Sequence, residues 1–343
     1  MNDMTPFVTK PKDWETDQEV RWCPGCGDYA VLKAVQRTMP EIGARPENTV
    51  FVSGIGCSSR FPYYMETYGF HTIHGRAPAV ATGVKLANPD LDVWIITGDG
   101  DALSIGGNHT MHLLRRNLNC QVLLFNNEIY GLTKGQYSPT SRVGTRTPST
   151  PLGSVDTPAN PCAFALGSGA RFVARGIDVH KKLTDVLKAA YAHQGAAFVE
   201  IFQNCIVYND DVFAPFTEKK QSVANQLWVE HGEPLLFAGR QKGLALDAER
   251  LTLRVVDVLD GDWRAAGVIV HDQCNRGLAH MLVEMPFGPF PMALGMLYDD
   301  PASTFESAVV RQNAQASEGK AANLQKLLAQ GQTWMVDKQP HMI

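Results

Sequence analysis

Two apolar segments, each followed by small polar residues, constrain the fold of this chain more than any other feature. Residues 93–97 (VWIIT) lead into the motif GDGD at 98–101, and residues 122–125 (VLLF) lead towards Asn127. Unbroken apolar runs of this length are typical of strands that are buried on both faces of a parallel sheet. The intervening segment 102–116 is long enough for a crossover helix. The sequence therefore predicts a strand–helix–strand unit, which places the chain in the α/β class.

This unit brings polar side chains to one edge of the predicted sheet. Asp99 and Asn127 each follow the carboxyl end of a strand, and open α/β sheets bind ligands at that edge. A carboxylate, a carboxamide and nearby carbonyl groups are the oxygen ligands that Mg2+ prefers when it also binds phosphate. Gly98 and Gly100 allow the backbone to approach a diphosphate closely. The pattern therefore predicts a site for Mg2+ and a diphosphate.

The chain contains seven cysteines, an odd number that argues against a framework of disulfides. Cys23 and Cys26 form a Cys-x-x-Cys pair before a predicted helix at 28–39, in which Asp28 has the residue type of an N-cap. Such a pair fits a redox dithiol, half of a zinc site or part of an iron–sulfur site. The pair alone does not choose among these three.

Two further cysteines are predicted to lie at the same sheet edge as Asp99. Cys57 follows a predicted strand at 49–53, and Cys205 follows another at 197–202. Four thiolates converging there fit one [4Fe-4S] cluster, with tetrathiolate zinc as the alternative. Cys120 and Cys162 lie in apolar segments and are expected in the core. We assign no role to Cys274.

The remaining sequence indicates one large α/β domain with additions at both ends. We expect an extended arm at 1–20, the α/β domain at 21–220, and an extension at 221–343 that contacts other subunits. Within the domain, we predict further helices at 78–87, 163–167 and 178–193, a strand at 171–174, the last buried strand at 197–202, and a long loop ending near 158.

Composition and charge exclude several functional classes. A net charge of −4 on 343 residues gives no electrostatic reason to expect nucleic-acid binding. The first 17 residues lack the apolar core of a signal peptide, and no apolar run approaches the roughly 20 residues of a membrane span. We therefore expect a cytoplasmic protein without membrane contact.

Five motifs together resemble a known enzyme family. The GDG and NN motifs resemble the diphosphate-binding motif of thiamine-diphosphate enzymes. The wider set is similar to the β subunit of 2-oxoacid:ferredoxin oxidoreductases, most of all the two-subunit, 2-oxoglutarate-type branch. The resemblance covers about residues 15–220 and is carried by WCPGCG (22–27), GIGCSS (54–59), HGRAPAVATGVKLANP (74–89), GDGDALSIGGNH (98–109) and NNEIYGLTKGQ (126–136).

The resemblance implies a role for each matching residue. The implied [4Fe-4S] ligands are Cys23, Cys26, Cys57 and Cys205. The implied Mg2+ ligands are the side chains of Asp99 and Asn127 and the carbonyl group of Ile129. The residues implied to line thiamine diphosphate are Ile55, Gly56, Cys57, Ser58, Gly98, Gly100, Asp101, Gly131 and Leu132.

The resemblance also implies a reaction and partners. The expected reaction is the reversible, coenzyme A-dependent oxidative decarboxylation of a 2-oxoacid, here 2-oxoglutarate to succinyl-CoA and CO2, with electrons passed to ferredoxin. Run in reverse, it would fix CO2, as in a reductive tricarboxylic acid cycle. A catalytic glutamate must come from a pyrimidine-binding domain, for which this chain has no second βα pattern after residue 220. We therefore expect an α subunit that supplies it, in an (αβ)2 heterotetramer.

Alternative functions concern the substrate and the redox step. Pyruvate or a branched-chain 2-oxoacid is an alternative substrate. A non-redox thiamine-diphosphate decarboxylase or carboligase is an alternative enzyme. A regulatory subunit that has kept the fold but binds no cofactor is an alternative without catalysis.

Two further residues are candidates for contacts with the substrate. The guanidinium group of Arg60 is a candidate partner for a substrate carboxylate, and His74 is a candidate donor of a hydrogen bond to the reacting species.

Overall fold

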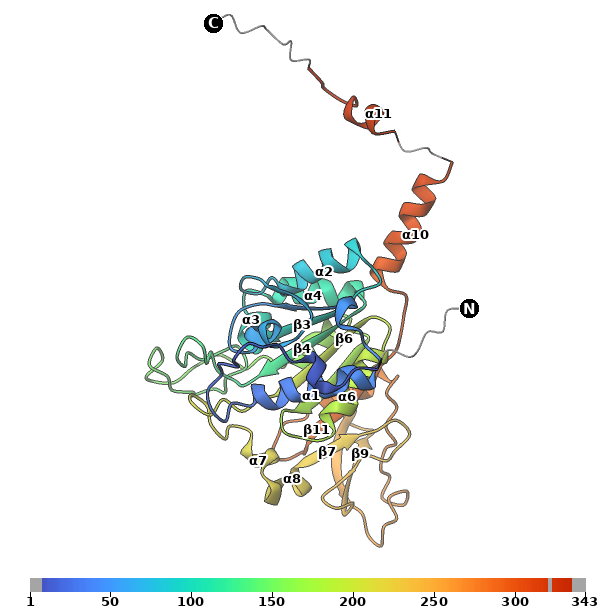
Figure 1. Cartoon of the computed structure of the whole chain (residues 1–343). Coiled ribbons are helices and arrows are strands. Elements are labelled where there is room, and N and C mark those ends of the chain that lie inside the picture. The colour runs from blue at the N-terminus through green and yellow to red at the C-terminus, as the bar shows by residue number, and fades with distance from the viewer. Residues whose placement is uncertain (1–7, 320–322, 335–343) are drawn as a thin grey trace, which may run out of the picture.

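The computed structural model, which describes residues 8–319 and 323–334, is organised around one eight-stranded sheet (Figure 1). Its strands follow the order β2 (Tyr68–His71), β1 (Thr49–Ser53), β3 (Asp92–Gly98), β4 (Cys120–Asn126), β6 (Ala196–Phe202), β5 (Phe172–Ile177), β11 (Met292–Asp299) and β7 (Gln226–Val229). The six strands from β2 to β5 are parallel, whereas β11 runs antiparallel to β5. The predicted α/β class is therefore confirmed, with a mixed sheet.

Helices cover both faces of this sheet, as expected for strands that are apolar throughout. One face packs against α1 (Asp28–Glu41) and α6 (Leu183–Ala192). The other face packs against α2 (Ala77–Ala87), α4 (Gly107–Arg116), α5 (Pro161–Gly167) and α9 (Arg276–Val283). Apolar side chains alternate between these two cores along each strand, so that Val93 and Ile95 face one core and Trp94 and Ile96 the other.

The predicted strand–helix–strand unit is present, but its crossover is broken into two helices. α3 (Asp99–Leu103) and α4 are separated at residues 104–106. Gly106 lies so close to the loop after β2 that a Cβ atom on Gly75 would be 2.4 Å from the Cα of Gly106. Both positions must therefore be glycine. The break between α3 and α4 allows the loop that carries His74 to pack against α3.

The segment after residue 220 contributes more to the sheet than its sequence predicts. β7 and β11 both belong to it, and β11 is mostly buried. The expectation that residues 197–202 form the last buried strand is therefore wrong. The same segment adds a small sheet of β8 (Leu236–Phe237), β9 (Lys242–Asp247) and β10 (Thr252–Asp257), and α8 (Lys219–Asn225) follows α7 (Ala214–Thr217).

Some predicted boundaries differ from those of the structure. The strand predicted at 171–174 continues to Ile177, and the helix predicted at 178–193 begins only at Leu183. In the predicted arm at 1–20, residues 1–7 lie outside the described residues. Residues 8–20 contain a short 3-10 helix, Pro11–Trp14. Trp14 is fully buried in the core that α1 covers. Two further 3-10 helices are Pro46–Asn48 and Ser58–Tyr64.

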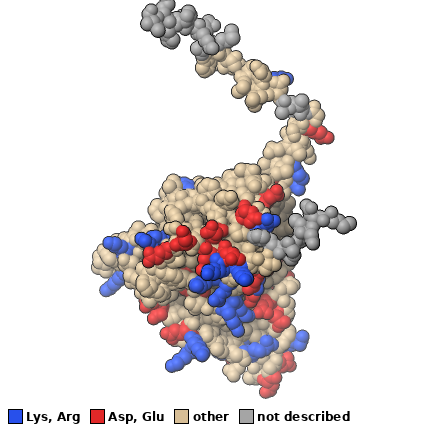
Figure 2. Space-filling model, in the orientation of Figure 1, with Lys and Arg blue, Asp and Glu red and all other residues tan. Residues whose placement is uncertain are grey.

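Near its C-terminus the chain leaves the body of the molecule. α10 (Phe305–Ser317) extends outwards and α11 (Leu324–Leu328) lies beyond it (Figure 1). Figure 2 shows few charged side chains on this projection, whereas acidic and basic side chains are mixed over the visible face of the body. Across the described residues, no helix has the length and hydropathy required to cross a membrane.

Candidate active site

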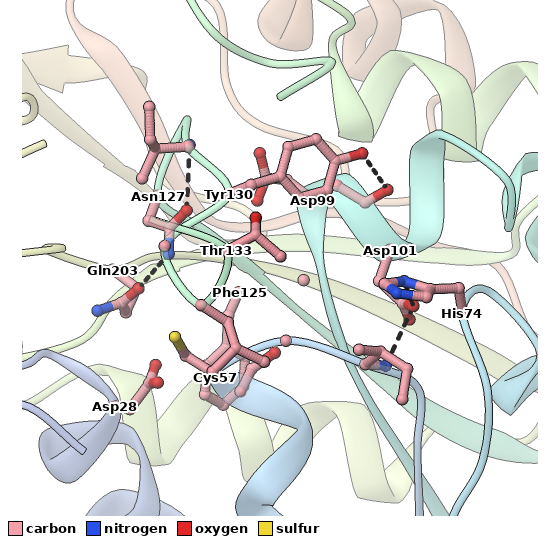
Figure 3. A pocket seen from close by; sticks show the side chains of 18 residues that line it. Asp28, Cys57, His74, Asp99, Asp101, Phe125, Asn127, Tyr130, Thr133 and Gln203 are labelled. Carbon is pink, nitrogen blue, oxygen red and sulfur yellow. Dashed lines mark hydrogen bonds and ion pairs between the residues drawn. The ribbon is translucent and has the colours of Figure 1, made fainter. Parts of the chain in front are cut away.

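A pocket opens at the carboxyl ends of β1, β3, β4 and β6, at the edge that the sequence predicts for ligand binding (Figure 3). The structure brings most predicted site residues to its wall: Ile55, Gly56, Cys57, Ser58, His74, Gly98, Asp99, Gly100, Asp101, Asn127, Ile129, Gly131 and Leu132.

Asp99 lies at the centre of this edge, as the first residue of α3. It is almost fully buried, and Oδ2 accepts a hydrogen bond of 2.6 Å from the hydroxyl of Thr140. Burial raises the pKa of the Asp99 carboxyl above its usual value, whereas the hydrogen bonds that it accepts favour ionisation. A buried carboxylate at the wall of a pocket is chemically suited to bind a divalent cation.

Asn127 follows β4, which is the neighbour of β3 in the sheet. Its side-chain amide donates to Oε1 of Gln203 at 2.9 Å, and its side-chain oxygen accepts from the backbone amide of Ile129 at 3.2 Å. Glu128 between them has the left-handed backbone value φ 55°. The loop is thus folded back on itself, and all three predicted Mg2+ ligands line this pocket.

Asp101 anchors the pocket loops to one another. Its carboxylate accepts hydrogen bonds from the backbone amides of Ile55 (3.1 Å) and Gly75 (2.7 Å) and from the hydroxyl of Thr97 (2.8 Å). Nδ1 of His74 lies 3.8 Å from the same carboxylate. Although Asp101 lines the pocket as predicted, its hydrogen bonds are made largely to the chain itself, and they fix the loop on which His74 is exposed.

The four predicted cluster cysteines gather at a second cavity that adjoins the first. Cys23, Cys26, Cys57 and Cys205 all line it, together with Arg60. A methyl group on Gly131 would lie 3.4 Å from Sγ of Cys205 and 3.6 Å from Sγ of Cys57. Nε2 of Gln203 donates to Sγ of Cys26 at 3.3 Å. None of the described cysteines is in a disulfide, so these four thiols are free to bind a metal group.

Burial controls the ionisation of three of these thiols. It raises the pKa of Cys57 to about 12, and it also raises the pKa values of Cys26 and Cys205. At neutral pH these three metal-free thiols are therefore protonated, and a bound metal would remove their protons. Among the described residues, no three His, Cys, Asp or Glu side chains are close enough together to form the site of a single metal ion.

The two cysteines that were predicted to lie in the core are separate from the cavity lined by the four cysteines. Cys120 and Cys162 are fully buried in the sheet region, as expected. Cys274 is exposed, and its thiol donates to the backbone oxygen of Asp299.

Several residues of the pocket are not identifiable from the sequence alone, and Asp28 is the clearest case. The prediction that Asp28 caps α1 is wrong, because Gly27 holds the N-cap position. The Asp28 side chain turns inwards and lies beside Cys57 (Figure 3). In the described chain neither of its oxygens has a hydrogen-bond partner, and burial raises its pKa to about 7. An acidic residue directly after Cys-x-x-Cys-Gly was the available signal.

Tyr130 and Gln203 also line the pocket, and Thr140 bonds to Asp99. The sequence does not identify these three residues, because contacts distant in the sequence define their roles. The ring of Tyr130 fills the space beside Gly100, where a Cβ atom would lie 2.2 Å from it, and its hydroxyl donates to the Gly100 carbonyl at 3.1 Å. Gly100 is thus required by a contact within the chain. Gln203 bonds to both Asn127 and Cys26 and so connects the two cavities.

Comparisons with known proteins agree on one kind of domain and one kind of enzyme. Residues 54–201 match the family model of the thiamine pyrophosphate enzyme, C-terminal TPP binding domain. The chain is 49% identical to 2-oxoglutarate oxidoreductase subunit KorB of Mycobacterium tuberculosis, in a match covering 96% of this chain and 89% of that protein. It is 50% identical to the β subunit of 2-oxoacid:ferredoxin oxidoreductase 1 of Aeropyrum pernix, over 57% of this chain and 62% of that one.

A solved structure extends the similarity to the whole fold. This is the 2-oxoglutarate:ferredoxin oxidoreductase of Magnetococcus marinus, determined with 2-oxoglutarate, coenzyme A and succinyl-CoA bound. The match has a TM-score of 0.76 and 33% identity, and it covers 96% of this chain and 98% of the other.

Proposed function

The chain belongs to the family of 2-oxoacid:ferredoxin oxidoreductase β subunits, and from this premise we propose that it carries thiamine diphosphate, Mg2+ and one [4Fe-4S] cluster for the oxidation of 2-oxoglutarate. The overall reaction converts 2-oxoglutarate, coenzyme A and two oxidised ferredoxins into succinyl-CoA, CO2, a proton and two reduced ferredoxins. With a strongly reducing ferredoxin the same enzyme would run towards CO2 fixation.

The observation that carries this proposal is that the two cavities share a wall. Cys57, Asn127, Gly131, Leu132 and Gln203 line both of them. A group bound at the predicted Mg2+ edge and a group held by the four cysteines would therefore be neighbours. This arrangement suits an enzyme in which electrons leave the substrate one at a time.

The donor atoms fit the proposed cofactors. Asp99, Asn127 and the Ile129 carbonyl would hold Mg2+, and the turn at Gly98–Gly100 would face the diphosphate. Cys23, Cys26, Cys57 and Cys205, which line one cavity, would ligate the cluster, a group that is typically held by four cysteine thiolates. When bound, thiamine diphosphate supplies the electron sink for decarboxylation.

The residues around the pocket would orient these groups and the substrate. Thr140 directs its hydroxyl at Asp99, and Asp101 holds the loop of His74 at the mouth. His74 is exposed enough to donate a hydrogen bond to a bound substrate. The hydrophobic side chains of Ile55, Ile129 and Leu132 would limit access of water to the reacting carbon.

Arg60 is the proposed partner of the second carboxylate of 2-oxoglutarate. It is half-buried in the wall of the cysteine cavity, and its Nε donates to the Tyr64 hydroxyl at 3.1 Å. We expect Arg60→Ala to lower kcat/KM for 2-oxoglutarate more than for pyruvate, by about 1.5–3 kcal/mol for the loss of a charged hydrogen bond. Steady-state assays with both acids measure this difference.

Arg21 provides the matched control for this prediction. It lines the same cavity but is paired with Glu19 in an exposed salt bridge, so Arg21→Ala should not separate the two acids. An equal loss for both acids in Arg60→Ala would assign Arg60 a structural role instead.

The proposed enzyme needs a second polypeptide. The described chain contains one cofactor-binding sheet, and we propose that an α subunit supplies the pyrimidine-binding domain and its catalytic glutamate, in an (αβ)2 heterotetramer. We expect this chain alone to show no turnover with 2-oxoglutarate, coenzyme A, thiamine diphosphate, Mg2+ and an electron acceptor under argon. Activity should appear when it is produced with the α subunit. Substantial turnover by the chain alone would overturn the two-subunit proposal.

A further inference from the structure

A line of buried polar side chains runs from the middle of the sheet to Asp99. Nε of Arg175 on β5 donates to Glu200 on β6 at 2.7 Å, and the other carboxylate oxygen of Glu200 accepts from Nδ2 of Asn126 on β4 at 2.8 Å. The oxygen of Asn126 lies 3.0 Å from the hydroxyl of Thr140, which lies 2.6 Å from Asp99. Of these five residues, the most exposed is Arg175, at 6%.

Stability alone does not account for this arrangement. Arg175 and Glu200 are directly opposite each other in neighbouring parallel strands, inside a sheet whose other buried side chains are mostly apolar. Replacing a buried ion pair by uncharged side chains of similar volume often leaves stability unchanged or raises it. The Arg175–Glu200 ion pair is better explained by a need to hold Thr140 and Asp99, at the other end of the line, in a defined geometry.

The chemistry of each group sets the direction of the hydrogen bonds. An ionised Glu200 only accepts, so Asn126 must present its NH2 group to it. The oxygen of Asn126 then faces the loop after β4, where it accepts from the backbone amide of Glu128 at 3.2 Å. Thr140 has one hydroxyl proton, which it shares between two acceptors, the Asp99 carboxylate at 2.6 Å and the Asn126 oxygen at 3.0 Å. The Ser138 hydroxyl also lies 3.2 Å from that of Thr140.

We propose that Thr140 is a positioning residue, oriented by Glu200 through Asn126, which fixes the carboxylate of Asp99 in the orientation that binds a divalent cation. This inference rests on the proposed role of Asp99 as a Mg2+ ligand and deepens it. A hydrogen bond to Oδ2 of Asp99 would leave Oδ1 available to bind the cation. The long loop that carries Thr140 thereby becomes part of the metal site.

The test measures metal binding directly, with Mn2+ as the probe. Electron paramagnetic resonance of free Mn2+ gives its dissociation constant in the presence of thiamine diphosphate, using the enzyme assembled with its partner subunit. We expect Thr140→Val, which keeps the shape and removes the hydroxyl, to weaken Mn2+ binding by about 10- to 100-fold. Thr140→Ser, which restores a hydroxyl, should recover most of the affinity.

A second set of variants tests the upstream part of the line. The double variant Arg175→Met, Glu200→Gln removes both charges together and leaves neither unpaired. It should weaken Mn2+ binding, and adding Thr140→Val to it should cause little further loss because both changes act on one line. Cys162→Ala is the control, because the Cys162 thiol bonds to Glu200 at 3.2 Å but lies off the line to Asp99.

The outcomes separate this inference from the proposed function. Mn2+ binding by the wild type that Thr140→Val leaves unchanged would overturn the inference and spare the metal site. Failure of the wild type to bind Mn2+ with the cofactor would overturn both. A loss in Thr140→Val that Thr140→Ser does not restore, or that is matched by a fall in the thermal unfolding midpoint, would assign Thr140 a structural role and overturn the inference.

Discussion

Asp99→Ala is expected to abolish Mg2+-dependent binding of thiamine diphosphate by the assembled enzyme, with little change in folding. The substitution removes the single carboxylate among the proposed metal ligands, and Mg2+ depends on charged oxygen ligands. The fold should persist, because the substitution also removes a buried charge and the Thr140 hydroxyl retains the Asn126 oxygen as its acceptor. Calorimetric titration of the cofactor, with and without Mg2+, measures this loss.

Asp92 provides a matched control at the opposite end of β3, the strand that leads into Asp99. It is the first residue of β3, and it accepts a hydrogen bond from Tyr191 far from the pocket. Asp92→Asn should bind cofactor as the wild type does. Unchanged cofactor affinity in Asp99→Ala would contradict the metal assignment.

Cys205→Ser is expected to lose the cluster and with it the reduction of ferredoxin. Cys205 lines the cavity with Cys57, and serine oxygen is a much poorer ligand for iron than thiolate. Iron and acid-labile sulfide should fall from about four of each per chain towards zero, together with the broad visible absorbance. Chemical analysis of anaerobically purified protein gives both contents.

Cys162→Ser is the control, because Cys162 is fully buried in the protein core and does not line this cavity. It should retain nearly all of its iron. Equal iron loss in the two variants, or zinc in place of iron in the wild type, would show that the cluster ligands have been chosen wrongly.

Local sequence was sufficient to predict the sheet edge that carries the site. The strands β3 and β4 are unbroken apolar runs that end at small polar residues, so their type and their ends are visible in the sequence. Parallel pairing then brings Asp99 and Asn127 together without further information. Cys57 and Cys205 follow the same logic, since both lie shortly after strand ends.

Contacts between distant segments could not be predicted in this way. The local sequence does not show that Gly75 packs against the break at residues 104–106, and the position of Asp28 after Cys-x-x-Cys-Gly does not show that its side chain turns inwards. Thr140 occupies an irregular loop whose contacts with Asp99 and Asn126 exist only in the folded chain. The antiparallel partner of β5 was missed because pairing between distant strands leaves no local pattern.

The late position of β11 in the chain has a consequence for biosynthesis. β5 pairs with β11 through Arg175 and Gly295, which are more than a hundred residues apart, whereas β1 to β6 are complete by Phe202. At ribosomal speeds of about 5–20 residues per second, the edge of β5 stays uncovered for on the order of ten seconds after its strand has emerged. The nascent protein therefore passes through a stage in which the cofactor edge is assembled but a buried strand is open to wrong partners. A chaperone would protect the open edge of β5 at this stage, whereas slow translation before residue 292 would prolong the stage.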